Sequence, residues 1–254
     1  MTYPLILSLL AGIFIGGASG YLGSLMLSKR MALVAGPLGH LTLPGVALAL
    51  LYGFDMALGA FPFVLLVIIL IWFLELKTKL PMEALTAVVF ASGVAIAFLF
   101  LPIEQAETAL VGDIARITFP ETIFSIVVSI CLFLIIKFIY PKMILINISD
   151  DLAESENINV KKYNFIYLMM IAVIVAIGVQ MVGGLLTAAL VSIPSASAKN
   201  LSRNLRQYSL ISMSVGAISS CVGIILFQLT GFPAGPLIIL ASTLIFLTSI
   251  VFKR

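Results

Sequence analysis

The chain has 254 residues, of which 62% are hydrophobic and 10% are charged, and its mean hydropathy is +1.23. About a quarter of the residues in a water-soluble domain are charged. The 14 basic and 11 acidic side chains of this chain are too few to cover the surface of a soluble protein of this size, so most of the surface must face lipid. The net charge of +3, with no basic tract carrying interleaved aromatic residues, excludes a nucleic-acid partner. The composition predicts an all-α, polytopic membrane helical bundle that forms one domain over residues 1–254.

A membrane-spanning helix needs about 20 predominantly apolar residues, and charges, Gly and Pro divide the chain into candidate spans. These spans are 4–27, 31–52, 57–74, 84–101, 121–140, 164–182, 184–198, 208–229 and 236–252. The seventh span is short, directly follows Gly183 and contains Gly184 and Pro194, so it is either a full crossing or a broken or re-entrant helix. Pro194 and the small residues at 195–198 predict a helix break and close packing near the inner face. We therefore expect eight or nine transmembrane helices, some of them broken or short.

The positions of Lys and Arg predict how the chain is oriented, because positively charged short loops stay in the cytoplasm. The first apolar run has no basic segment before it, so it is predicted to be a membrane span and not a cleaved signal peptide. With the N-terminus outside, the loops on the inside carry nearly all of the basic side chains: Lys29, Arg30, Lys77, Lys79, Lys142, Lys161, Lys162, Lys199, Arg203, Arg206, Lys253 and Arg254. Only Arg116 falls outside. The charges favour a cytoplasmic C-terminus with nine spans, or with eight spans and a segment that enters and leaves by a half-crossing, because eight spans alone would place Lys253 and Arg254 outside.

The only histidine, His40, lies in the middle of the second span, within MALVAGPLGHLTLPGVALALL. Residues that interrupt helices flank it on both sides: Gly36, Pro37, Gly39, Pro44 and Gly45. An ionisable side chain inside a membrane is costly and marks a functional site. Irregular backbone at that depth is tolerated only where it is buried in protein or lines a cavity. Two interpretations follow: a translocation path for a ligand that imidazole binds, or a neutral histidine hydrogen-bonded to a neighbouring helix.

The longest polar stretch, residues 141–163, holds four of the eleven acidic residues and is predicted to be cytoplasmic. Asp150 and Asp151 stand as N-cap candidates before LAESE, which predicts a short amphipathic helix. This segment is either a solvated connector or a docking element for a partner.

Motifs for enzymatic chemistry are missing from the sequence. It contains no G-x-x-x-x-G-K-[ST], so we do not expect the chain to hydrolyse nucleotide by itself. It also contains no H-E-x-x-H and no G-x-S-x-G, and Cys131 and Cys221 lie in apolar stretches without metal-ligand spacing. The chain is therefore predicted not to be an enzyme.

Five ordered blocks that span nearly the whole chain resemble zinc/manganese permease subunits of ATP-binding-cassette importers. They are GYLGSLMLSKRMALVAGPLGHLTLPGVALALLYG, ALVGDIARITFPETI, ISDDLAESENINV, MVGGLLTAALVSIPSASAKNL and GFPAGPLIIL. The resemblance implies a permease of the type shared with vitamin B12 and siderophore importers, working as a homodimer in the cytoplasmic membrane. It also implies separate ATPase subunits that bind ATP, and an extracytoplasmic metal-binding protein that delivers Zn²⁺ or Mn²⁺. No permanently bound cofactor is expected.

The resemblance also implies roles for particular residues. His40 is the expected metal ligand, and the flanking Gly and Pro residues are expected to shape the ion path. Residues 148–163 resemble the coupling segment that contacts the ATPase, with these candidates for the contact: Asp150, Asp151, Leu152 and Ala153.

The sequence departs from the family pattern at two positions. Gly36 stands where the family has an aspartate one helical turn before the histidine, which removes a hard carboxylate ligand and favours zinc over manganese. Asn157 stands where the family usually has glycine. Two other functions stay open: an ion-coupled secondary transporter, which normally carries acidic residues inside its spans, and a membrane scaffold that transports nothing.

Overall fold

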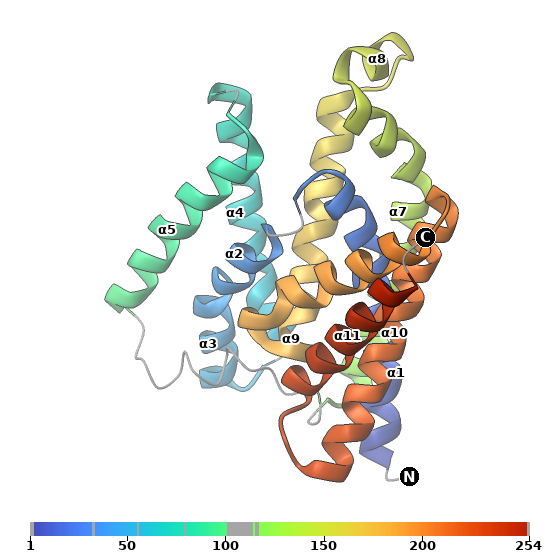
Figure 1. Ribbon diagram of the computed structural model, residues 1–254. Coiled ribbons are helices and arrows are strands. Elements are labelled where there is room, and N and C mark those ends of the chain that lie inside the picture. Colours follow the sequence, from blue (N-terminus) through green and yellow to red (C-terminus); the bar gives the residue numbers. More distant parts are fainter. Residues whose placement is uncertain are drawn as a thin grey trace.

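The computed structural model describes residues 3–31, 34–54, 56–78, 80–100, 114 and 117–252 (Figure 1). The long elements within these ranges are all α-helices, which confirms the predicted fold class. The helices are α1 Tyr3–Ser28, α2 Ala35–His40, α3 Leu43–Tyr52, α4 Met56–Thr78, α5 Met82–Phe100, α7 Phe119–Ile148, α8 Asp150–Ser155, α9 Val160–Leu201, α10 Leu205–Thr230 and α11 Ala234–Val251. Lys79, Arg116, Lys253 and Arg254, which contribute to the predicted orientation, lie outside the described residues.

Six helical stretches in the described part of the chain are long and apolar enough to cross a membrane. They are Pro4–Ser28, Ala57–Thr78, Phe119–Ile148, Val160–Gly184, Leu205–Thr230 and Ala234–Val251. Of the other three predicted spans, 84–101 corresponds to the continuous helix α5, and the remaining two are less regular. The span predicted at 31–52 is divided into α2 and α3, and the span predicted at 184–198 is the second half of α9. The expected broken and short spans are thus present.

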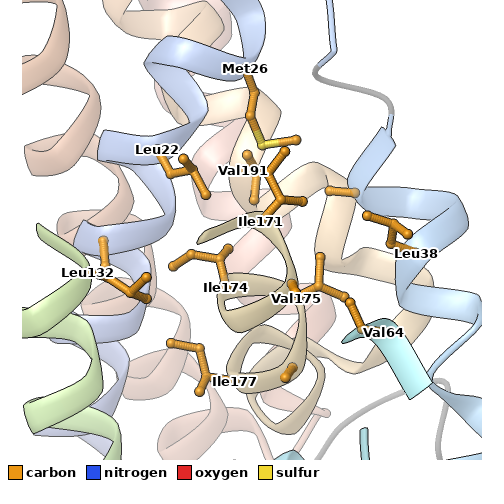
Figure 2. Packing of buried hydrophobic residues seen from close by; sticks show 14 of the residues in the cluster. Leu22, Met26, Leu38, Val64, Leu132, Ile171, Ile174, Val175, Ile177 and Val191 are labelled. Atoms are coloured by element: carbon orange, nitrogen blue, oxygen red, sulfur yellow. The ribbon is translucent and has the colours of Figure 1, made fainter. Parts of the chain in front are cut away.

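The first half of α9 lies at the centre of the bundle, between α1, α4 and α7 (Figure 1). Its side chains belong to a continuous buried cluster to which neighbouring helices also contribute. Figure 2 shows part of this cluster: Ile171, Ile174, Val175 and Ile177 of α9 with Leu22 and Met26 of α1, Leu132 of α7 and Val64 of α4. The outer faces of the peripheral helices carry exposed apolar side chains, such as Phe138 and Leu244. This distribution is the one expected where lipid covers the outside of the protein.

Helices α1 and α10 pack backbone to backbone. Gly16 and Gly216 approach so closely that a Cβ on either would overlap the carbonyl group of the other. Nearby, the Ser212 hydroxyl donates a hydrogen bond of 2.5 Å to the Gly20 carbonyl oxygen. Small residues let helices associate in lipid, where the hydrophobic effect does not draw them together. The small residues of these two spans therefore stabilise the bundle.

Helix α9 breaks at Gly183, where φ is 79° and ψ is 166°. This backbone conformation is essentially restricted to glycine. Beyond the break, the second half of α9 turns away from the first and lies beside α11 (Figure 1).

The prediction of a break at Pro194 is wrong, because the helix continues through that residue. A proline removes only one backbone hydrogen bond, whereas the φ of Gly183 cannot belong to a right-handed helix. The predicted close packing of the following residues does occur, since Ser195, Ser197 and Ala198 are buried.

Most connections that carry basic residues lie toward one end of the bundle. Figure 1 shows the α4–α5 turn and α8 at the upper end, together with the end of α1, and the N-terminus at the lower end. The predicted segregation of positive charge is therefore compatible with the fold. The orientation of the two ends relative to the membrane stays a prediction.

Candidate functional site

The predicted histidine site lies where α2 crosses the break in α9. His40 is the last residue of α2, and Gly39 directly precedes it. Gly39 contacts Gly184 through the backbone: a Cβ on Gly184 would lie 2.7 Å from the Gly39 carbonyl oxygen. Because no larger residue fits at this crossing, the two glycines bring the interruption of the second span against the break in α9. These two irregular segments are far apart in the sequence.

The turn after His40 satisfies the backbone groups that the interruption would otherwise leave free. The amide of Leu41 donates to the Pro37 carbonyl oxygen at 3.2 Å, and the amide of Thr42 donates to the Gly39 carbonyl oxygen at 3.3 Å. The Thr42 hydroxyl donates a second hydrogen bond of 2.5 Å to the Gly39 carbonyl oxygen. Pro44 lies in the first turn of α3, where a helix needs no amide donor. This part of the chain is therefore a defined, internally hydrogen-bonded turn.

The residues predicted to shape the ion path differ in burial: some are partly buried, and others are buried between packed helices. Gly36, Pro37 and Pro44 are partly buried, and a Cβ on Gly36 would lie 3.2 Å from the Cβ of Ala188. Gly45 is buried and packs against Gly59 of α4, where a side chain on either residue would overlap the other helix. The structure thus gives Gly45 a packing role between α3 and α4.

The His40 side chain is partly buried and lies beside α5. Its ring centroid is 5.7 Å from that of Phe90, and the two ring planes are inclined by 44°. Within the described residues, no group of three or more His, Cys, Asp or Glu side chains lies close enough together to hold a metal ion. The site therefore presents one imidazole, without a preformed cage of charged ligands.

Gln180 is a further candidate that the sequence reasoning missed. Its side chain is 7% exposed and lies on α9, one helical turn before Gly184. Apart from the hydroxyl side chains of Ser, Thr and Tyr, it is the only buried polar side chain among the residues that the structure describes. The signal available in the sequence was an amide within the apolar stretch IVAIGVQMVGG.

The segment predicted to be cytoplasmic contains the short helix α8, with Ser149 as its N-cap. The Ser149 hydroxyl accepts a hydrogen bond of 3.3 Å from the amide of Leu152. The prediction that Asp150 or Asp151 caps this helix is therefore wrong. Both lie in the first turn with exposed side chains, where a carboxylate interacts favourably with the helix dipole.

Leu152 is 45% exposed, whereas Ala153 is completely buried. Of the four candidates for the ATPase contact, the two aspartates and Leu152 thus face outward, and Ala153 packs inside this chain.

Asn157 ends α8 in the left-handed conformation that glycine usually adopts, with φ of 57°. Its amide donates to the Glu154 carbonyl oxygen at 3.0 Å, and the amide of Ile158 donates to the Ala153 carbonyl oxygen at 3.0 Å. This pair of hydrogen bonds defines a Schellman motif. Asparagine tolerates the left-handed region better than other side chains, so the turn forms although the family glycine is absent.

Comparison with known proteins extends over the whole chain. The manganese import system permease protein ScaB of Streptococcus gordonii is 27% identical over 246 residues, which cover 95% of this chain and 88% of ScaB. The high-affinity zinc uptake system membrane protein ZnuB of Buchnera aphidicola subsp. Baizongia pistaciae is 24% identical over 246 residues, with 94% of each chain covered.

The fold is also similar to that of a solved structure, PsaBC from Streptococcus pneumoniae in complex with Fab. The TM-score is 0.83 at 22% sequence identity, and the similarity covers 98% of this chain and 91% of the other. Residues 1–253 of this chain match the family described as "ABC 3 transport family". Because this match extends over nearly every residue, the chain belongs to the ABC 3 transport family.

Proposed function

We propose that the chain is the membrane-spanning subunit of an ATP-driven importer for a divalent metal ion. The observation that carries this proposal is the partly buried imidazole of His40, held where the interrupted second span crosses the break in α9. The names of the relatives support the class of cargo, since ScaB is a manganese import permease and ZnuB is a zinc uptake membrane protein. Imidazole binds transition-metal ions, and one such ligand suits an ion that is passed on quickly.

Zinc is the favoured cargo, and manganese is the alternative. The helical turn before His40 offers Gly36 and no carboxylate. Imidazole suits zinc, whereas manganese prefers carboxylate, carbonyl and water ligands. Gln180 lies on α9 one helical turn before Gly184, and its buried side chain adds a neutral amide to this part of the helix. A donor set of imidazole and neutral groups therefore favours zinc.

The proposal includes separate ATPase subunits, an extracytoplasmic metal-binding protein and a second copy of this chain. On the cytoplasmic side, α8 presents Asp150, Asp151 and Leu152 to the ATPase, while buried Ala153 anchors the helix to the rest of the chain. Charge reversal with Asp150→Lys and Asp151→Lys should weaken co-purification of the ATPase. Glu154→Lys and Glu156→Lys make the same charge change on exposed side chains of the same segment and serve as the control. Equal co-purification of all these variants would count against the aspartate contact.

The proposed function is tested by uptake of radioactive zinc and manganese into vesicles that contain this chain with its ATPase and binding protein. We expect zinc uptake that requires ATP and is lost in both His40→Ala and His40→Gln. Glutamine can still form hydrogen bonds to a neighbouring helix but does not supply an imidazole. Loss of uptake in both variants therefore supports a metal ligand, whereas wild-type uptake in His40→Gln supports a structural histidine.

Other outcomes contradict the proposal as a whole. If the wild-type chain takes up neither metal in an ATP-dependent manner, the cargo is not a divalent metal ion of this kind. Uptake that follows an ion gradient without ATP would instead indicate a secondary transporter.

A further inference from the structure

A polar pocket of about 230 Å³ lies where the coupling helix α8 approaches the ends of the membrane helices. It is lined mainly by charged or amide side chains from five different elements: Lys29, Arg30, Glu75, Glu83, Asp150 and Asn164. Lys29 follows the last residue of α1, Glu75 lies in the last turns of α4, Asp150 begins α8 and Asn164 lies in the first turns of α9. The pocket thus joins α8 to three helices that form the core of the bundle.

Lys29 occupies the centre of these contacts. Its ammonium group donates a hydrogen bond of 2.5 Å to the side-chain oxygen of Asn164. The same nitrogen lies 5.3 Å from the ring centroid of Tyr167, a fully buried residue of α9. A cation over an aromatic ring is attracted by the ring's electrons. Two independent contacts therefore fix the end of α1 against α9.

The carboxylates in the pocket come from the other elements. Burial lowers the pKa of the Lys29 ammonium group, and the negative charges of Glu75 and Asp150 oppose this change. Glu75 belongs to α4 and Asp150 to α8, so the single positive charge of Lys29 attracts both helices at once. A displacement of α8 would move Asp150 relative to Lys29 and change the electrostatic balance at the ends of α1 and α4.

We propose that Lys29 is a positioning residue that links the coupling helix α8 to α1, α4 and α9. The inference rests on the proposed function, because it assigns the route by which a movement imposed on α8 reaches the membrane helices. Lys29 does not contact the transported ion in this role. It acts through Asp150, Glu75 and Asn164.

Lys142 provides a matched control. Its ammonium group donates a 2.5 Å hydrogen bond to the Tyr163 hydroxyl and lies 4.7 Å from the centroid of that ring. It therefore resembles Lys29 in its hydrogen bond and its aromatic contact, and it joins α7 to the beginning of α9. Lys142 is not among the residues that line the pocket with Asp150 and Glu75.

The first experiment measures amide hydrogen exchange in the full chain in lipid nanodiscs, for wild type, Lys29→Met, Lys29→Arg and Lys142→Met. The reporters are the amides of Ala153, Asn157 and Ile158, which are hydrogen-bonded in and after α8. We expect about tenfold faster exchange in Lys29→Met, which corresponds to about 1.4 kcal/mol. Lys29→Arg should restore protection, and Lys142→Met should leave it unchanged. Unchanged exchange in Lys29→Met, or an equal increase in Lys142→Met, overturns the inference.

The second experiment compares the number of metal ions taken up per ATP hydrolysed when the ATPase is present. We expect a fall of several-fold in Lys29→Met, with recovery in Lys29→Arg and a wild-type ratio in Lys142→Met. A wild-type ratio in Lys29→Met overturns the inference even if exchange has increased. If the wild-type chain takes up no metal, the proposed function fails, and the exchange measurement still decides whether Lys29 holds α8.

If Lys29→Met does not fold, Asp150→Asn is the alternative variant, because it removes the attraction between Lys29 and the exposed carboxylate of Asp150. The same increase in exchange supports the inference, and wild-type exchange overturns it.

Discussion

Substitution of Gly184 by alanine tests whether the contact between α2 and the break in α9 holds the histidine site together. The added methyl group would lie 2.7 Å from the Gly39 carbonyl oxygen, whereas ordinary contact begins at 3.4 Å. The two segments must therefore separate by about 0.7 Å. Because the clash is with backbone, no side-chain rotation relieves it, and the displacement reaches His40, the residue after Gly39.

Forcing extra volume into a well-packed interior costs about 1–3 kcal/mol. We expect Gly184→Ala to lower the free energy of unfolding by about 2 kcal/mol, which corresponds to a fall in Tm of roughly 4–8 °C for a chain of this size. If His40 lines the proposed ion path, zinc uptake should fall by a larger factor than the amount of folded protein, because the imidazole is displaced.

The assay combines thermal unfolding in nanodiscs with uptake normalised to the amount of folded protein. Gly36→Ala is the matched control, since it adds the same methyl group to the same pair of helices. Its Cβ would lie 3.2 Å from the Cβ of Ala188, so a shift of a few tenths of an ångström accommodates it. If Gly184→Ala has the Tm and uptake of Gly36→Ala, the Gly39–Gly184 contact does not position His40 and the reasoning is refuted.

Two further predictions concern the break in α9 and the choice of metal. Gly183→Ala places a side chain at φ of 79° and ψ of 166°, so we expect a loss of about 1–3 kcal/mol in the thermal unfolding assay. Gly231→Asn is its control, because asparagine tolerates the φ of 74° and ψ of 0° found there; equal stability of the two variants would contradict the assignment of the break. Gly36→Asp restores a carboxylate one helical turn before His40, and manganese uptake should rise relative to zinc in a competition assay because manganese prefers oxygen ligands. A ratio that stays the same or shifts toward zinc would show that position 36 does not contribute a ligand.

The fold class could be predicted from the sequence because membrane helices are determined locally. Each span must satisfy its own backbone hydrogen bonds in lipid, so hydropathy and length identify it without knowledge of its neighbours. The family resemblance of the five sequence blocks is confirmed by the match over residues 1–253. The presence of a short helix at α8 was predicted for the same local reason, since a polar run with capping residues marks this segment, although Ser149 caps the helix and not Asp150 or Asp151. The roles of His40, Asp150, Asp151 and Leu152 stay predictions.

The break in α9 shows the limit of local reasoning. Gly183 and Pro194 both stood out in the sequence as possible breaks. A proline can remain inside a continuous membrane helix, and a glycine can be helical or not. The local sequence therefore does not decide between a break at Gly183 and a break at Pro194. The tertiary structure decides it, because the second half of α9 packs beside α11 only if the helix turns at Gly183.

The sequence by itself determined that this chain is a membrane helical bundle, with one histidine within an interrupted span and an acidic segment between two long helices. Only the tertiary structure decided which of these features meet. It placed Gly39 against Gly184, brought Lys29 beside Asn164 and Tyr167, and buried Ala153 while leaving Leu152 exposed. Hydropathy and helix signals act over one or two turns of the chain, whereas these contacts arise from the crossing of helices that are distant in the sequence. The physical reason is that packing depends on the shapes of both partners, and a local pattern contains only one of them.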